Sequence, residues 1–358
     1  MGPRRTSRRL RAARAAGAPR LLLIGHLDTV FEKDGPFQRF ERLSDSTARG
    51  PGVIDMKGGN VVMLLALGAL SDAALLDGLE VTAILTGDEE KSGEPLELAR
   101  QDLIEAADQA DVAIGFEDGA GDPRTAVVSR RGSSGWVLNV HGEPAHSSQI
   151  FRGDVGSGAI YEAARILAAF HDTLSREPLL TANPGAIVGG TAVTFDEDAS
   201  RGSAFGRNNV IAESTVVSGD LRPLSIEQRE RAKDTMRRIA AASPPHARAT
   251  ISFDDGYPPL APSDGNRRLL ALYDAASRDL GFGPVEAVDP RRAGAADVSF
   301  TEGRVKMALD GIGLMGSGGH TVLETADLRT LPSQAKRAAV LLARLSREAS
   351  LAPPARGR

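Results

Sequence analysis

Short apolar runs, each leading into a histidine or an acid, constrain the fold of this chain more than any other feature. Leu21 to Ile24, Val81 to Thr86 and Asp111 to Phe116 have the length and composition of buried strands. Apolar segments with helical character, such as Val61 to Leu70, alternate with them. Strands that alternate with helices predict β-α-β units and a mainly parallel sheet, and therefore an α/β fold.

The polar residues after these strands are expected to meet. In open parallel sheets, functional sites gather beyond the carboxyl ends of the strands. His26, Glu89 and Glu117 each follow an apolar run directly or after a short turn. The sequence therefore predicts that separate segments contribute to one site at one edge of the sheet.

The pattern changes near Ser129, which indicates a second domain. Trp136, Leu138 and Val140 alternate with polar residues, as in a half-exposed strand. A helical pattern, a further strand and a charged helix follow, and Ser225 has the capping-box form of a helix start. This order predicts a small inserted α+β domain.

The domain boundaries follow from these changes in pattern. We expect residues 129–252 to form the inserted domain, and the segment 252–266, rich in Pro, Gly and Asp, to be the returning linker. Residues 1–128 and 253–358 then form one discontinuous catalytic domain, because His320 must reach the candidate ligands of the first half.

Composition narrows the class of protein. Hydrophobic content of 41% and charged content of 25% are those of a soluble globular chain, and no apolar stretch approaches the length of a membrane span. The net charge of −4 gives no reason to expect nucleic acid or an anionic membrane as a partner. The chain has no cysteine, so a metal site must use histidine and carboxylates.

The N-terminus is basic. The first 20 residues contain seven arginines and no acid, and they lack the apolar core of a secretory signal. We expect either an unstructured basic tail or a start codon placed upstream of the true one. The expected location is cytoplasmic.

Five short stretches carry side chains suited to two divalent cations. Two histidines and three carboxylates can hold such a pair with one carboxylate between the ions, which leaves one glutamate as a base. The side chains are His26 with Asp28, Asp55, Glu89 with Glu90, Glu117, and His320.

Local context supports this interpretation. His26 and Asp28 are two residues apart on an extended segment, so Asp28 can accept a hydrogen bond from the imidazole and fix its orientation. Asp55 lies between glycines, which permit close approach from both sides. Each motif alone is more often a surface histidine, a polar turn or a solvated acidic loop; the specific signal is their joint occurrence in this order.

In this order the stretches resemble the M20 family of metallopeptidases, and within it the glutamate-carboxypeptidase-like branch. The resemblance runs from about Leu21 to the C-terminus. It extends beyond the candidate ligands to several longer motifs, which are Gly25-His-Leu-Asp-Thr-Val30, Gly50-Pro-Gly52, Asp55-Met-Lys-Gly-Gly59, Asp88-Glu-Glu-Lys91, Ala145-His-Ser147, Asn209-Val-Ile211 and Gly219-Asp-Leu-Arg222.

The resemblance implies a role for each candidate ligand. His26, Asp55 and Glu117 would hold one zinc ion, and Asp55, Glu90 and His320 would hold the other. Cobalt and manganese are the alternative metals. Asp28 would orient His26, and Glu89 would be the general base in amide hydrolysis.

The resemblance also implies a homodimer. The inserted domain would be a ferredoxin-like dimerisation and lid domain. His146 would cross from it to the partner's site and stabilise the oxyanion there. Arg222 and Asn209 resemble residues that bind the terminal carboxylate of the substrate, a group that suits an arginine fork.

Two departures from the family pattern stand out. Family members usually carry further sheet and helix before the His-x-Asp strand, whereas 25 residues precede His26 here. We expect either an incomplete N-terminus or an open sheet edge. Gly294-Ala295-Ala296-Asp297 replaces an expected Gly-Gly-Thr-Asp segment. Asp297 fits the pattern, and the lost hydroxyl would alter specificity.

The expected activity is hydrolysis of an amide bond in small N-acyl amino acids or dipeptides with a free carboxylate. A related alternative is an N-acyl amino acid deacetylase, desuccinylase or aminoacylase. An alternative of another class is a metal-binding homologue without catalysis. Glu89 discriminates against it, because an inactive homologue would be expected to lose the base.

Overall fold

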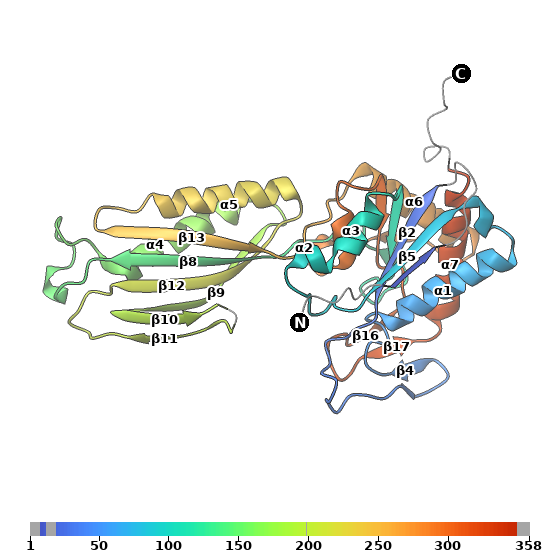
Figure 1. Cartoon of the computed structure of the whole chain (residues 1–358), viewed down its shortest axis with the longest axis horizontal. Coiled ribbons are helices and arrows are strands. Elements are labelled where there is room, and N and C mark those ends of the chain that lie inside the picture. Colours follow the sequence, from blue (N-terminus) through green and yellow to red (C-terminus); the bar gives the residue numbers. More distant parts are fainter. Residues whose placement is uncertain (1–7, 12–18, 198, 349–358) are drawn as a thin grey trace, which may run out of the picture. The chain divides into compact units, whose positions relative to one another are not determined.

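The chain forms two compact units (Figure 1). The computed structural model describes residues 8–11, 19–197 and 199–348. Residues 1–130 and 260–358 belong to unit 1, and residues 131–259 form unit 2. The expected boundaries were 129 and 252. The second lies later because a strand runs on to Asp255, so part of the expected returning linker belongs to the sheet of unit 2.

Unit 1 is built on a five-stranded sheet with the strand order β1-β5-β2-β6-β15. Strands β5, β2, β6 and β15 are parallel, which confirms the predicted mainly parallel sheet. The bounds are Arg8–Arg11 for β1, Arg20–His26 for β2, Glu80–Thr86 for β5, Val112–Gly115 for β6 and Met307–Leu309 for β15.

The basic N-terminal segment differs in part from the expected unstructured tail. Arg8–Arg11 is strand β1, which pairs antiparallel with β5. The outer edge of β5 is therefore covered by this strand. The backbone of a strand can pair whatever its side chains, so the arginine-rich composition gave no sign of β1. Residues 1–7 and 12–18 lie outside the described residues.

Helices pack around this sheet and enclose the main core. Helix α1 packs against α7 and β2, and α6 packs against β15 and α7. Buried leucines from β2, α1 and α7 share this core with Tyr273 of α6. The helices are α1 (Lys57–Asp72), α2 (Leu96–Ala99), α3 (Gln101–Ala107), α6 (Asp264–Asp279) and α7 (Thr330–Leu345).

Two small sheets complete unit 1. One has the order β16-β17-β4-β3 and joins the C-terminal part of the chain to the segment before Asp55. The other pairs β7 with β14. The bounds are Glu41–Arg42 for β3, Thr47–Arg49 for β4, Thr125–Ala126 for β7, Glu286–Ala287 for β14, Gly316–Ser317 for β16 and Thr325–Asp327 for β17.

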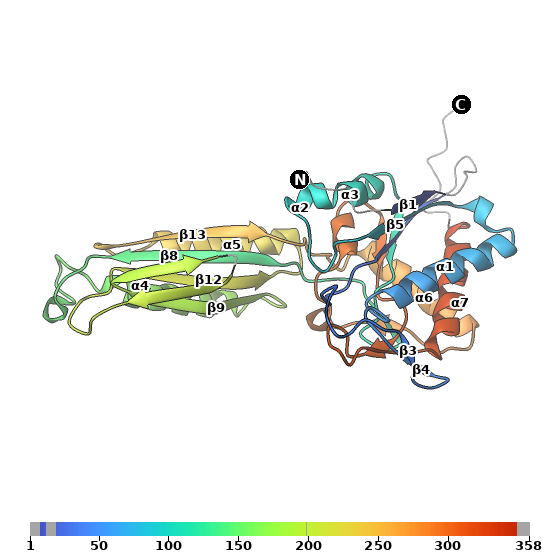
Figure 2. The same cartoon turned by 60° about the horizontal axis from the view of Figure 1, so that its bottom comes forward.

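Unit 2 is an antiparallel sheet of order β13-β8-β12-β9 with two helices, visible in Figure 2. Its main elements follow the β-α-β-β-α-β order of a ferredoxin-like fold, with a β10–β11 hairpin between β9 and β12. They are β8 (Ser134–Gly142), α4 (Gly158–Leu174), β9 (Thr181–Gly190), β10 (Ala192–Asp196), β11 (Arg201–Phe205), β12 (Ser214–Arg222), α5 (Ile226–Ala241) and β13 (Ala247–Asp255).

Local sequence signals explain these elements. In β8, Trp136, Leu138 and Val140 are buried and alternate with more exposed residues, as predicted. Ser225 caps α5 by accepting the Gln228 amide, as the capping-box pattern indicated. Among the described residues, no helix is long and apolar enough to cross a membrane.

Candidate metal centre

The sheet of unit 1 brings the candidate ligands to one edge. His26 is the last residue of β2, and Glu90 and Glu117 follow β5 and β6. Asp55 lies in the turn before α1, and His320 lies between β16 and β17. Because β2, β5 and β6 are parallel, the three candidate ligands at their carboxyl ends lie at the same edge of the sheet.

The ligand atoms form two groups that share Asp55. His26, Asp55 and Glu117 make one group, and Asp55, Glu90 and His320 make the other; within each, one atom per residue lies within 4.8 Å of the others. His26 Nε2 is 3.0 Å from Asp55 Oδ1, and His320 Nε2 is 2.8 Å from Asp55 Oδ2. Asp55 therefore turns one oxygen toward each histidine, as a carboxylate between two cations would.

The negative charge of this cluster raises the pKa values of both histidines. Burial opposes a charge on His26, but hydrogen bonds to Asp28 and Asp55 prevail and raise its pKa to about 12. The hydrogen bond to Asp55 is the main reason that the pKa of His320 rises to about 9. In the metal-free chain, protons on the histidines supply the positive charge that the carboxylates require.

The same crowding also raises the pKa values of the glutamates. Burial and neighbouring carboxylates raise the pKa of Glu89 to about 8, and they raise the pKa values of Glu90 and Glu117. Within the described part of the chain, Glu90 Oε1 is buried and makes no hydrogen bond. A buried and an exposed imidazole together with clustered carboxylates are a donor set that fits zinc, cobalt or manganese.

Asp28 supports both sides of the centre. Its Oδ1 lies 3.2 Å from His26 Nδ1, on the ring edge away from Asp55. The same carboxylate accepts the backbone N–H groups of Glu89 (3.2 Å) and Glu90 (3.0 Å). Asp28 therefore lies beside the His26 ring, where it was expected to orient it, and it also fixes the turn after β5, which the sequence did not indicate.

His320 adopts a backbone conformation that non-glycine residues rarely take. Its φ is 62°, in the left-handed region, and Gly318 before it has φ 78°. Such conformations persist where the surrounding structure fixes them, and they cluster at functional sites. The glycine-rich segment was expected to let the backbone approach a metal closely, and the structure shows a sharp turn there.

A buried ionic network holds the Glu89–Glu90 turn. Arg100 is fully buried and donates to Asp297 Oδ1 (2.7 Å), Asp88 Oδ1 (2.9 Å) and the Asp88 carbonyl (2.8 Å). Asp297 also accepts from the Thr86 hydroxyl at 2.6 Å. Asp297 was expected near the site, whereas Arg100 was missed, because its partner Asp297 lies 197 residues away along the chain.

A second network supports Glu117. Asp310 accepts the Glu117 N–H at 3.2 Å and the Arg130 Nε–H at 2.7 Å, and Arg130 also donates to the Gly294 carbonyl at 2.9 Å. A Cβ at Gly115 would lie 2.2 Å from Asp310 Oδ1, so the last position of β6 must be glycine for Asp310 to fit. Neither Arg130 nor Asp310 lies in a motif that could be recognised in the sequence, so neither was predicted.

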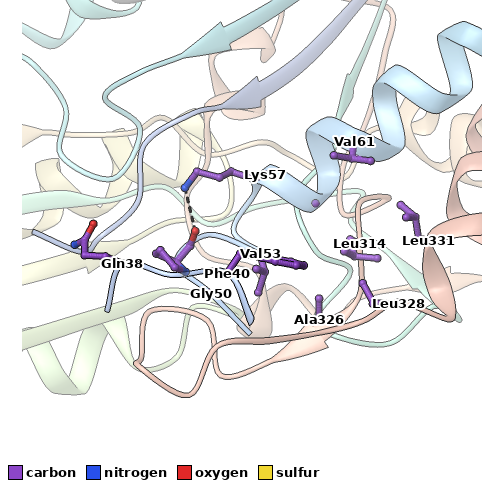
Figure 3. Close-up of a pocket in the computed structure, with 12 residues that line it drawn as sticks. Gln38, Phe40, Gly50, Val53, Lys57, Val61, Leu314, Ala326, Leu328 and Leu331 are labelled. Carbon is purple, nitrogen blue, oxygen red and sulfur yellow. Dashed lines mark hydrogen bonds between the residues drawn. The ribbon is translucent and has the colours of Figure 1, made fainter. Parts of the chain in front are cut away.

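An apolar pocket of about 500 Å³ borders the chain segment that leads to Asp55 (Figure 3). Val53, Val61 on α1, Leu314 and Leu328 are among the side chains that line it. Lys57 lies at its border and donates to the Pro51 carbonyl at 3.1 Å. No ligand of either group lines this pocket, so it is separate from the candidate metal centre.

Comparison with known proteins agrees with the geometry. The family model for peptidase family M20/M25/M40 matches residues 22–346. The chain belongs to this peptidase family. It is therefore a metallopeptidase or amidohydrolase, and the resemblance seen in the sequence is confirmed.

Individual relatives of the M20 family chain match different shares of its length. Carboxypeptidase G2 from Pseudomonas sp. (strain RS-16) is 27% identical over 337 residues, which cover 91% of this chain and 74% of the relative. A probable succinyl-diaminopimelate desuccinylase from Staphylococcus epidermidis is 31% identical over 138 residues, 37% of this chain and 33% of the relative.

Solved structures share the fold. Aminopeptidase PepT from Bacillus cereus superimposes with a TM-score of 0.70 at 19% identity, covering 95% of this chain and 84% of that one. A dinuclear metal-binding M20 peptidase from Bacillus subtilis has a TM-score of 0.63 at 15% identity, covering 95% and 84%.

The remaining candidate residues of the M20 chain lie in unit 2, and the structure brings only two of them together. His146 pairs with Val210 in a β-bridge, and the Ser147 N–H donates to the Asn209 carbonyl at 2.9 Å. His146 and Asn209 therefore occupy adjacent loops beyond the Ser214 end of β12. Arg222 ends that strand, and eight residue steps of about 3.4 Å separate Ser214 from Arg222 by roughly 27 Å.

Proposed function

We propose that this chain is a two-cation amidohydrolase that cleaves small dipeptides or N-acyl amino acids with a free carboxylate, in the manner of a glutamate carboxypeptidase. The observation that carries the proposal is Asp55, whose two oxygens face the histidines of two ligand groups. Zinc is the proposed metal, and the name and 27% identity of carboxypeptidase G2 support the substrate class.

Glu89 is the proposed general base. Divalent cations bound in the two groups would polarise the scissile carbonyl and acidify water. Glu89 lies in the turn that Asp28 and Asp88 hold, so its backbone position is fixed. Burial keeps its pKa well above that of an ordinary glutamate, which suits a residue that takes a proton from water and returns it to the leaving amine.

His146 is the proposed oxyanion donor. Its Nδ1 accepts the Ser148 N–H at 3.3 Å, which places the proton of the neutral ring on Nε2. The side chain is exposed, so Nε2–H can donate to an external group. Asn209 on the adjacent loop and Arg222 are the proposed contacts of the substrate carboxylate. Asp220 accepts from Arg222 Nε at 2.6 Å and orients the guanidinium.

The separation within unit 2 supports a composite site in a homodimer. One small substrate cannot contact His146 and Arg222 of the same chain if roughly 27 Å of β12 lies between them. If both act on one substrate, they come from different chains. His146 and Asn209 would then serve the partner's site, while Arg222 would serve its own.

Unit 2 offers a surface for such a dimer. Ile160 and Tyr161 on α4 and Ile187 on β9 are large apolar side chains exposed by 48%, 57% and 56%. Strand β9 is at the edge of its sheet, so a second copy could pair with it. A two-fold axis at this edge would be isologous, the usual form of a homodimer contact.

A second candidate substrate class is favoured by one comparison. The segment similar to a probable succinyl-diaminopimelate desuccinylase points to removal of an acyl group from an amino acid. The two reactions share the amide-hydrolysis step and the proposed residues. They differ in which side of the amide the enzyme recognises.

A hydrolysis screen tests the proposal. Metal-replete protein is incubated with dipeptides, N-acetyl, N-succinyl and longer N-acyl amino acids, and the liberated amine is measured. Each substrate is paired with its C-terminal amide, which lacks the free carboxylate. We expect turnover of free-carboxylate substrates and little turnover of the amides. Absence of turnover across the set, with two cations bound, would support a non-catalytic homologue.

A further inference from the structure

Glu324 is a buried carboxylate that no ligand group uses. It is 1% exposed and accepts three backbone N–H groups, those of Gly52 at 2.9 Å, Ile54 at 2.9 Å and Asp55 at 3.2 Å. The Gly52–Asp55 segment thus curls around one carboxylate from a segment about 270 residues away. Amides that converge in this way form a concave anion-binding nest.

This arrangement ties two ligands of one group to each other. Glu324 fixes the backbone of Asp55 directly, and it lies four residues after His320 in the same turn, where its own N–H bonds to the Thr321 carbonyl at 3.0 Å. His320 Nε2 meets Asp55 Oδ2 at 2.8 Å. The Glu324 side chain therefore closes a loop of contacts that runs from Asp55 to His320.

The other group is held by different means. His26 ends β2, Glu117 follows β6, and Asp310 accepts the Glu117 N–H at 3.2 Å. Among the described residues, Glu324 makes no hydrogen bond to either of these ligands or to the backbone next to them. If the carboxylate oxygens of Glu324 are removed, Asp55 and His320 should shift relative to each other. The spacing of His26 and Glu117 should stay the same.

We propose that Glu324 is a positioning residue that sets the spacing of Asp55 and His320, and thereby the cation affinity of the Asp55–Glu90–His320 group. This inference rests on the proposed two-cation function. Partners that orient metal ligands typically change metal affinity by about 10- to 100-fold when they are removed. We expect the loss of cation affinity to be confined to one ligand group. A general loss of fold stability would instead weaken cation binding in both groups.

Glu324→Gln is the informative variant. Glutamine keeps the size of the side chain but has one acceptor oxygen, and its amide nitrogen would face a backbone donor. Metal-free protein is titrated with Co²⁺ against a competing chelator, and the visible absorption of each bound equivalent is followed. We expect one equivalent to bind about 10- to 100-fold more weakly with an altered spectrum, while the other keeps its affinity and spectrum. Glu324→Asp, which retains the charge but is shorter, should show the same selective loss.

Two further variants make the test specific. Glu302 accepts the Ala261 N–H at 3.0 Å, so Glu302→Gln makes the same change in a carboxylate–amide contact elsewhere and should leave both affinities unchanged. Asp310→Asn weakens the support of Glu117 and should affect the other equivalent. Equal weakening of both equivalents in Glu324→Gln, or no change in either, would overturn the positioning role. Wild-type protein that binds fewer than two cations would instead refute the proposed function.

Discussion

Replacing Glu89 by glutamine should stabilise the metal-free protein at neutral pH, although it removes the proposed base. Burial and the carboxylates of Asp297, Glu90 and Asp55 raise the pKa of Glu89 from an ordinary 4.5 to about 8. Glutamine has nearly the same shape as glutamate, and it carries no charge that must be removed from water when the chain folds. The variant therefore removes an unfavourable ionisation and little packing.

The magnitude follows from this difference in pKa. A group whose pKa is higher in the folded state stabilises the fold fully below its unfolded pKa, and that stability is lost as pH rises toward the folded pKa. Between pH 4.5 and 8, Glu89 lowers the free energy of unfolding by about 1.4 kcal/mol per pH unit, or about 5 kcal/mol in total. For a unit of this size, each kcal/mol corresponds to about 2–4 °C in Tm.

Calorimetry from pH 5 to pH 8 in the presence of a chelator measures the effect. The Tm difference between Glu89→Gln and wild type should grow with pH and reach roughly 10–20 °C at pH 8. Glu97→Gln, at an exposed carboxyl in the first turn of α2, should give a curve parallel to wild type. A Glu89→Gln curve that is also parallel to wild type would refute this account of the Glu89 environment.

The same variant tests the chemistry once cations are restored. Glu89→Gln should keep close to two bound cations, because Glu89 belongs to neither ligand group. Its turnover should fall by about 100- to 10,000-fold, the usual contribution of proton transfer. Normal turnover with full occupancy would show that another group is the base.

Four further outcomes are expected. Chelation should abolish activity and lower the Tm, and zinc, cobalt or manganese should restore both; full activity after verified metal removal would exclude a metal mechanism. Glu90→Gln should lose affinity for one cation, as measured by metal content after dialysis. Arg222→Ala should weaken free-carboxylate substrates by about 2–5 kcal/mol and leave amidated analogues little changed, as measured by kcat/KM. His146→Ala and Glu89→Ala dimers should each be inactive, but co-refolding them in equal amounts should recover about a quarter of wild-type activity, because about half the dimers are mixed and each mixed dimer has one working site. If mixed dimers confirmed by mass recover no activity, a crossed site is ruled out.

The sequence allowed the meeting of the candidate ligands at one sheet edge to be predicted, because each candidate is marked locally. His26 and Glu117 directly follow apolar strands, and the carboxyl ends of parallel strands meet for a general geometric reason. Glycines mark the turns at Asp55 and His320. These signals lie within a few residues of the side chains that they predict.

The supporting residues could not be predicted because their partners are far away along the chain. Arg100 bonds to Asp297, and Glu324 bonds to the Gly52–Asp55 amides; nothing near either residue indicates that it is buried. Strand β1 was missed because its pairing depends on the free edge of β5. The distance between Asn209 and Arg222 depends on the length of β12, which separates the two motifs and is contained in neither.

The two candidate ligand groups, which share Asp55, become complete at different times as the chain is synthesised. His26, Asp55 and Glu117 all precede unit 2, so the first group can assemble on β5, β2 and β6 while unit 2 is still emerging from the ribosome. The second group must wait for His320, which is synthesised after unit 2. A nascent chain would therefore gain its two cation sites in sequence, and occupation of the second would signal that the ends of the discontinuous unit have joined.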